Sequence, residues 1–140
     1  MDIDAVDVRA ELVHRPIEGG WTVDALQLVA ANEGDSPVLL RGVALLFPTG
    51  LRHFLPGEGS YPCELTPGGH KADWIECATL ARELIAVGLS GSVRLQALFF
   101  IAPARMRTIY ERRLSAAGWA QGWGPACYSQ PFRFDTARWP

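Results

Sequence analysis

Short segments in which apolar and polar residues alternate run through most of this chain, and they restrict its fold more than any other feature. In the clearest segment every second residue is apolar, namely Val6, Val8, Ala10 and Leu12. Successive side chains of a β-strand point to opposite faces of the sheet, so this pattern predicts a strand with one buried and one solvated face. Residues that favour turns separate the segments. The sequence therefore predicts an all-β fold.

The remaining strands are expected from the same pattern. They lie at residues 21–30, 38–47, 71–77, 92–101 and 106–111, with a short edge strand at 51–56 and a terminal strand at 131–134. Gly42 follows Arg41 inside the third segment, and a glycine within a strand often marks a β-bulge. We therefore expect a bulge at this point.

One short helix is expected at residues 78–88. Leu80, Leu84 and Val87 have helical spacing, and Gly88 stands where a left-handed residue commonly ends a helix. Thr79 is placed to cap the start of the helix. The segment is too short to form a core alone, so it is expected to link strands.

Composition limits the functions that are open to the chain. It has 140 residues, of which 49% are hydrophobic and 20% charged, and this composition predicts a single folded domain. The net charge of -2 gives no reason to expect a nucleic acid or an anionic membrane as partner. The acidic, alternating start differs from a signal peptide, so a cytoplasmic location is expected. No motif predicts a cofactor.

Two turn motifs connect these elements to a known architecture. Residues Asn32 to Val38 follow the pattern N-x-G-x-x-P-V, and Leu65 to Gly68 follow L-x-P-G before a strand that contains Trp74. Their order resembles that of small bacterial immunoglobulin-like β-sandwich domains of unassigned function. The resemblance covers residues 26–110 and implies an immunoglobulin-like two-sheet antiparallel sandwich with one short helix between strands. It implies no catalytic residue, and the chain departs from it in a Gly/aromatic insert at 114–130 before the C-terminal strand.

The sequence offers few candidates for catalysis or metal binding. Cys63, Cys77 and Cys127 lack the spacing of a metal site, although Cys63 and Cys77 flank one turn, which leaves a disulfide open. Cys63, His70 and Asp73 are the nearest set for thiol chemistry, and they lie around one turn with nothing to activate the thiol. We expect no catalytic residue and no metal, and a small thiol hydrolase is the weakest alternative.

Two segments are candidate binding surfaces for a protein partner or for self-association. The first is a basic cluster around one predicted hairpin, formed by Arg105, Arg107, Arg112 and Arg113. The second is a Gly-spaced aromatic segment that contains Trp119, Trp123 and Tyr128. Arg and aromatic residues dominate protein interfaces, but a solvated strand face and a self-buried loop would also explain these segments. The sequence thus predicts a non-catalytic protein-interaction or assembly module that acts through this loop or an exposed edge strand. The alternative is a carbohydrate-binding sandwich with Trp119 and Trp123 as stacking platforms.

Overall fold

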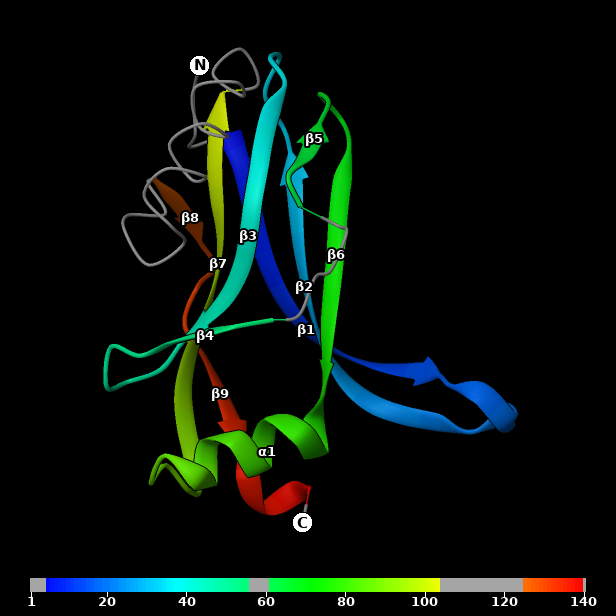
Figure 1. Ribbon diagram of the computed structural model, residues 1–140, viewed down its shortest axis with the longest axis vertical. Coiled ribbons are helices and arrows are strands. Elements are labelled where there is room, and N and C mark those ends of the chain that lie inside the picture. The colour runs from blue at the N-terminus through cyan, green and yellow to red at the C-terminus, as the bar shows by residue number, and fades with distance from the viewer. Residues whose placement is uncertain (1–4, 56–60, 104–124, 140) are drawn as a thin grey trace.

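The computed structural model describes residues 5–55, 61–103 and 125–139, and within them the chain forms two antiparallel β-sheets and one α-helix (Figure 1). The strands are β1 (Val6–Pro16), β2 (Thr22–Asn32), β3 (Val38–Leu46), β4 (Arg52–Phe54), β5 (Cys63–Leu65), β6 (His70–Glu76), β7 (Ser92–Pro103), β8 (Ala126–Tyr128) and β9 (Phe132–Asp135). The helix α1 (Cys77–Ala86) connects β6 to β7, and short 3-10 turns occur at Glu18–Gly20 and Thr136–Arg138.

Each sheet has a long central strand or pair of strands. The first sheet has the order β1-β2-β6. In the second sheet β3 pairs with β7, while β4 and β5 pair with successive parts of β3, and β8 and β9 pair with successive parts of β7. The nine described strands therefore fill seven positions. The predicted all-β class with a helix between strands is confirmed.

The two sheets pack face to face around one core. Alternate residues of each long strand are buried in it, among them Val6, Val8, Leu26 and Leu28 of the first sheet and Val43, Leu45, Val93, Leu95, Ala97 and Phe99 of the second. Val93, Leu95, Ala97 and Phe99 alternate along β7 and are all buried in this core. The alternation of apolar and polar residues in the sequence therefore identifies the face of each strand that is buried in the core.

The bulge expected near Arg41 is present. The register between β3 and β7 shifts between Leu40 and Gly42, and all the residues from Val38 to Leu45 are buried. An extra residue in one strand of an antiparallel pair bends that strand and increases its twist. The bulge therefore accounts for the change of alternation that the sequence shows at this point.

Helix α1 closes one end of the space between the sheets (Figure 1). Leu80 and Leu84 are fully buried against the core, and Gly88 follows the helix with a φ of 84°, as expected. Two expectations were wrong. Thr79 lies within the helix and accepts a hydrogen bond from Arg82 instead of capping the start. Val87 is 46% exposed, because the helix ends at Ala86 and the chain turns away from the core.

Some strand boundaries differ from the prediction. Strand β1 continues to Pro16, beyond the alternation that ends at Leu12, and the short strand β5 was not among the expected strands. Strand β8 lies inside the segment that the sequence assigns to an insert at 114–130. The expected strand at 106–111 lies outside the described residues. The terminal strand is confirmed as β9.

The Asn32 side chain explains the first turn motif. Its Nδ2 donates hydrogen bonds of 2.9 Å to the carbonyl of Ser36 and 3.0 Å to that of Leu65, while its Oδ1 accepts one of 3.0 Å from the N–H of Gly34. Asn32 is only 2% exposed, so these partners replace the water that it loses. At Gly34 a Cβ would lie 2.8 Å from the Cβ of Ala5, which requires glycine. This asparagine joins the β2–β3 turn to β5.

Candidate functional site

Most of the residues that the sequence nominates for partner binding lie outside the described part of the chain. These are Arg105, Arg107, Arg112, Arg113, Trp119 and Trp123. Tyr128 is described: it lies on β8 opposite Leu98 and its side chain is 45% exposed. The interaction role of this segment therefore stays a prediction.

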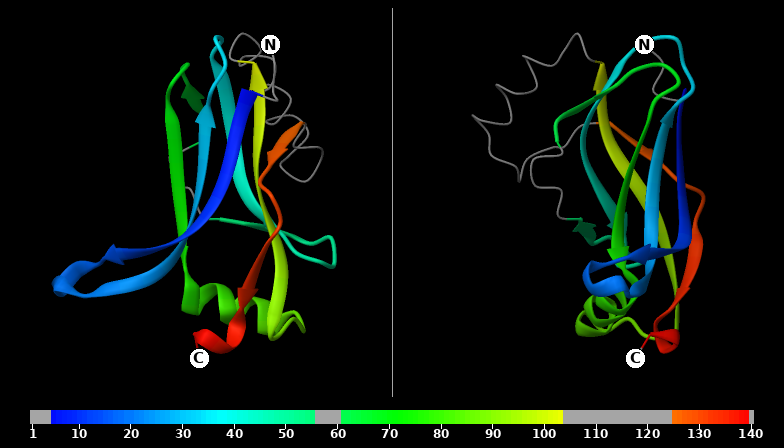
Figure 2. Two further views of the ribbon diagram at one scale, coloured as in Figure 1. Left: turned by 180° about the vertical axis from the view of Figure 1, so that it is seen from behind. Right: turned by 90° about the vertical axis from the view of Figure 1, so that its right-hand side faces the viewer.

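The most prominent surface feature of the described chain is a two-stranded hairpin arm, residues 12–24. Strand β6 ends its pairing with β2 where Glu76 lies opposite Ala25, while β1 and β2 continue to the pair Pro16 and Thr22. Figure 1 shows the two strands leaving the body past β6, and Figure 2 shows the same projection from behind. Beyond Ala25 neither edge of the arm pairs with another described strand.

The tip of the arm is a tight turn that two glycines make possible. Gly19 and Gly20 have φ values of 88° and 80°, which residues with a Cβ rarely adopt. The N–H of Ile17 donates a hydrogen bond of 2.8 Å to the carbonyl of Trp21 and closes the turn. The turn therefore fixes the position of Trp21 at the start of β2.

The arm exposes large apolar side chains. Trp21 is 73% exposed, Leu12 is 51% exposed and Ile17 is 42% exposed. Leu12 belongs to the face of β1 that carries the buried Val6 and Val8, but it lies in the arm, where its side chain is exposed. An exposed tryptophan beside other apolar residues is typical of a protein-binding surface.

The face of the arm opposite Leu12 carries an ordered row of polar side chains. Gln27 Nε2 donates a hydrogen bond of 3.2 Å to Glu11, and Gln27 Oε1 accepts one of 3.5 Å from Arg15. The Arg15 guanidinium also lies 5.0 Å from the centre of the Trp74 ring. This stacking covers one face of Trp74 and holds Arg15 against β6.

The base of the arm contacts the C-terminal segment. Asp24 lies opposite His14, and its carboxylate is 2.6 Å from His14 Nδ1 and 3.2 Å from Nε1 of Trp139. The Trp139 ring stacks on Phe134 with 4.8 Å between centres. A small hollow of about 120 Å³ lies at this junction, lined by Leu12, Val13, His14, Asp24, Arg138 and Trp139. The hollow is too small for most ligands. The contacts of Trp139 with Asp24 and Phe134 connect the arm to β9.

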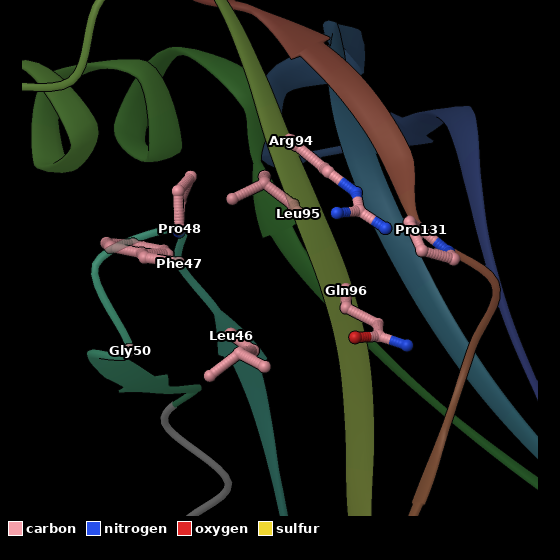
Figure 3. A pocket seen from close by; sticks show the side chains of 8 residues that line it. All are labelled: Leu46, Phe47, Pro48, Gly50, Arg94, Leu95, Gln96 and Pro131. Atoms are coloured by element: carbon pink, nitrogen blue, oxygen red, sulfur yellow. The ribbon is translucent and has the colours of Figure 1, made fainter.

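A second hollow, of about 240 Å³, lies between the β3–β4 connection and the start of β7 (Figure 3). It is lined by Leu46, Phe47, Pro48, Gly50, Arg94, Leu95, Gln96 and Pro131. The amide of Gln96 is held by its hydrogen bond of 2.8 Å to the carbonyl of Ser129. The hollow is below the volume of usual ligand pockets and offers one guanidinium, Arg94, as a charged group.

A polar cluster lies on the core side of β6. Tyr61 donates a very short hydrogen bond to Asp73, and Lys71 Nζ lies 3.2 Å from both carboxylate oxygens of Asp73. The side chains of Lys71 and Asp73 are 21% and 13% exposed. Burial, then the hydrogen bond to Asp73, raise the pKa of Tyr61 far above its usual range. Charged residues that point inward on an edge strand protect that edge from pairing with other strands.

The residues considered for thiol chemistry are not brought together. His70 is exposed and Asp73 points to the core side, because positions three apart on a strand lie on opposite faces. Asp73 is engaged by Tyr61 and Lys71, and the Sγ of Cys63 contacts the carbonyl of Glu64 at 3.8 Å.

The cysteines are free thiols. Cys63 pairs opposite Leu40 in the second sheet, whereas Cys77 begins α1, so the disulfide that the sequence left open is not formed. Burial, reinforced by the charge of Asp24, raises the pKa of Cys77 to about 11. Within the described ranges no group of three His, Cys, Asp or Glu side chains is placed to hold a metal ion. The helix found in the same ranges is not of a length and hydropathy that could cross a membrane.

The sequence did not single out Trp21. Its alternation with Val23 and Ala25 placed it at the start of a strand, where a partly buried side chain is expected. The available signal was its position directly after Gly19 and Gly20, which puts the ring at the end of a hairpin. Its exposure depends on where β6 ends, which the local sequence does not report.

Comparisons with known proteins give little further guidance. No family model matches the chain, and no curated protein matches it. Among solved structures it is similar to an X-ray structure of a Northeast Structural Genomics Consortium target, with a TM-score of 0.47 and 9% identity over 94% of this chain and 87% of that one.

Proposed function

We propose that this chain is a non-catalytic protein-interaction module that binds its partner through the hairpin arm. The exposure of Trp21 carries this proposal, because an indole that is 73% in water at the end of a two-stranded projection adds nothing to the core. Ile17 lies opposite Trp21 and extends the apolar surface at the tip, while Leu12 is exposed on the opposite face of the arm. Burial of these side chains against another protein would supply the binding energy.

The form of the arm supports the same function. Its turn is closed by the hydrogen bond between Ile17 and Trp21, and its base is held through Asp24, so it presents its tip in one arrangement. A preorganised surface loses less conformational entropy when it binds. Strand β1 also forms an edge of its sheet, and exposed edges accept added strands. The edge-strand mode that the sequence predicts is thus the one that the described residues favour.

The arrangement of strands favours an immunoglobulin-like sandwich as the scaffold. A three-stranded sheet faces a sheet of four positions, and a helix carries the chain from one to the other. This order of antiparallel strands is typical of such domains, which commonly serve recognition. The fold alone assigns no partner.

Photo-crosslinking tests the proposal. A benzoylphenylalanine residue is placed at position 21 of the chain in its native cells, and a second variant carries it at position 85. Ile85 is the control because it is 53% exposed on α1, far along the chain from the arm. We expect discrete cross-linked protein products from position 21 and few from position 85. Equal patterns from both positions would refute the arm as the binding surface.

A sugar ligand would give a different result. The carbohydrate alternative depends on Trp119 and Trp123, which lie outside the described residues, and Trp74 has one ring face covered by Arg15. If sugar rather than protein is bound, position 21 gives no protein product, and fluorescence of the wild-type chain changes on titration with oligosaccharides. That outcome would replace the interaction proposal.

A further inference from the structure

We infer that the partner of the arm is a second copy of this chain, which pairs antiparallel along the outer edge of β1 about a two-fold axis at Val13. This inference rests on the proposed function, because it names the partner of the same arm.

The backbone of β1 offers hydrogen-bonding groups at alternate residues. The N–H of Ile17 donates to Trp21 at one end of the hairpin, and the N–H of Glu33 donates to Ala5 at the other. In an antiparallel ladder bonded and non-bonded pairs alternate, so the odd-numbered residues of β1 bond to β2. The N–H and C=O groups of the even-numbered residues, Ala10 to His14, therefore point to the outer edge.

Only part of this edge is open. The first half of β1 lies beside β7 and β8 of the other sheet, and the second half leaves the body as the arm (Figures 1 and 2). Pro16 occupies an edge-facing position and has no N–H, so the donors end at His14. An added strand would therefore pair with the stretch from Ala10 to Pro16.

The charges along this stretch select a second copy and one register. When Val13 lies opposite its own copy, Glu11 lies opposite Arg15 of the second copy, and the symmetry repeats this pair on the other side of the axis. If the axis lay at Leu12 instead, Arg9 of one copy would face Arg15 of the other. If it lay at Glu11, the two Glu11 side chains would face each other. Opposite charges across strands stabilise a sheet, whereas like charges destabilise it.

The same register suits the backbone and the guanidinium. Leu12 of one copy would pair with His14 of the other through two backbone hydrogen bonds, and His14 with Leu12 in the same way. The N–H of Ala10 would donate to the carbonyl of Pro16, so the missing N–H of the proline is not needed for this bond. Arg15 has one long hydrogen bond, of 3.5 Å, to the neutral amide of Gln27, and its buried Nε has no hydrogen-bond partner among the described residues. To reach Glu11 of the second copy, its guanidinium would leave Gln27 and the Trp74 ring. A carboxylate is the stronger partner for a guanidinium.

Complementary charge variants test this pairing in the full chain. Glu11→Arg alone sets arginine against Arg15 in both pairs, and Arg15→Glu alone sets Glu11 against glutamate. By sedimentation velocity each variant alone should dimerise on the order of tenfold more weakly than wild type or worse. A mixture of the two variants should form a heterodimer, because every pair then joins opposite charges. Arg9→Glu should leave the dimer intact, since Arg9 has no charged residue opposite it in this register.

A cross-link tests the axis separately. Residues at the axis form a non-bonded pair, whose Cα atoms are about 4.5 Å apart, a distance that a disulfide can span. With Cys63→Ser to remove a partly exposed thiol, Val13→Cys should give a disulfide-linked dimer on mild oxidation, and Glu11→Cys should not. Monomeric wild type at all concentrations, or a mixture as weak as its components, overturns the inference. If position 21 still cross-links another protein in that case, the arm remains a binding surface and only the second copy is excluded.

Discussion

The indole Nε1 of Trp139 lies 3.2 Å from Oδ2 of Asp24 and joins the C-terminal turn to the arm across 115 positions of sequence. The same carboxylate holds His14 through its other oxygen at 2.6 Å. Asp24 lies just beyond the last pair between β2 and β6, where β1 is the one described strand that still pairs with β2. This single side chain therefore anchors the arm to the body at the point where the sheet stops supporting it.

Trp139→Phe should weaken this anchor without removing the stacking on Phe134. We expect the free energy of unfolding to fall by about 1 kcal/mol, the usual net value of one hydrogen bond. Urea unfolding followed by circular dichroism measures it. Trp139→Ala, the matched control, removes the stacking as well and should cost more. A Trp139→Phe variant as stable as wild type would show that the hydrogen bond contributes nothing, whereas equal losses for the two variants would show that the stacking contributes nothing.

Asn32→Asp should be more damaging, although it changes only one group. The carboxylate cannot donate to the carbonyls of Ser36 and Leu65, and it would place a charge where the side chain is buried. We expect the free energy of unfolding to fall by about 3 kcal/mol, since the buried carbonyl of Leu65 and the partly buried carbonyl of Ser36 both lose their donor. Urea unfolding measures the loss, and Glu33→Gln, an exposed neighbour, is the control. A variant as stable as wild type would contradict this account of the turn.

Lys71→Met should destabilise the fold by leaving Asp73 with Tyr61 as its hydrogen-bond partner in the cluster. Because the pair is partly exposed, we expect a loss of about 2 kcal/mol, below that of a fully buried pair. The double variant Lys71→Met with Asp73→Asn should recover most of this loss, since the amide still accepts from Tyr61. It should also self-associate through β6, which size-exclusion chromatography detects. A monodisperse double variant would mean that the charges do not protect this edge.

Stability should fall at alkaline pH because of Cys77. Its pKa is raised from 9.0 to about 11 by burial, so the folded chain retains this proton after the unfolded chain has lost it. The stabilisation is therefore complete below pH 9 and decreases as the pH rises towards 11, by on the order of 1 kcal/mol per pH unit. The pKa of Tyr61 is shifted in the same direction and adds to the loss above pH 10.

Urea unfolding between pH 8 and pH 10 checks this dependence. Cys77→Ala should flatten the curve in that interval, and Cys63→Ala should leave its slope unchanged. A Cys77→Ala variant with the wild-type slope would assign the effect to another group. The matched probe is thiol labelling of the folded chain, in which Cys77 should react far more slowly than the partly exposed Cys63.

Trp21→Ser should have almost no effect on stability, in spite of the size of the side chain. Exposed positions usually change the free energy of unfolding by about 0.5 kcal/mol or less. Differential scanning fluorimetry compares it with Leu26→Ala, where the side chain is 2% exposed and a loss of about 3 kcal/mol is expected. A large loss for Trp21→Ser would mean that the indole supports the hairpin itself and is not held for a partner.

The sequence predicted the elements whose alternation is set by one buried face. Strand β7, the bulge beside Arg41 and the glycine that ends α1 were all recognised, because each depends on local periodicity or on backbone freedom. Strand β5 was missed because it has three residues, too few for a period to appear. The candidate site was missed because the exposure of Trp21 depends on the end of β6, far away in the sequence.

The charged pair on β6 also determines how far an assembly could grow. Lys71 and Asp73 make one border of the three-stranded sheet unsuitable for strand addition, and the other border, β1, is used by both members of a symmetric pair. Within the three-stranded sheet, no unprotected edge is left after two molecules have paired. Pairing through this sheet therefore stops at a dimer. Neutralising Lys71 and Asp73 would open β6 to further copies, and the dimers could then assemble into a fibre.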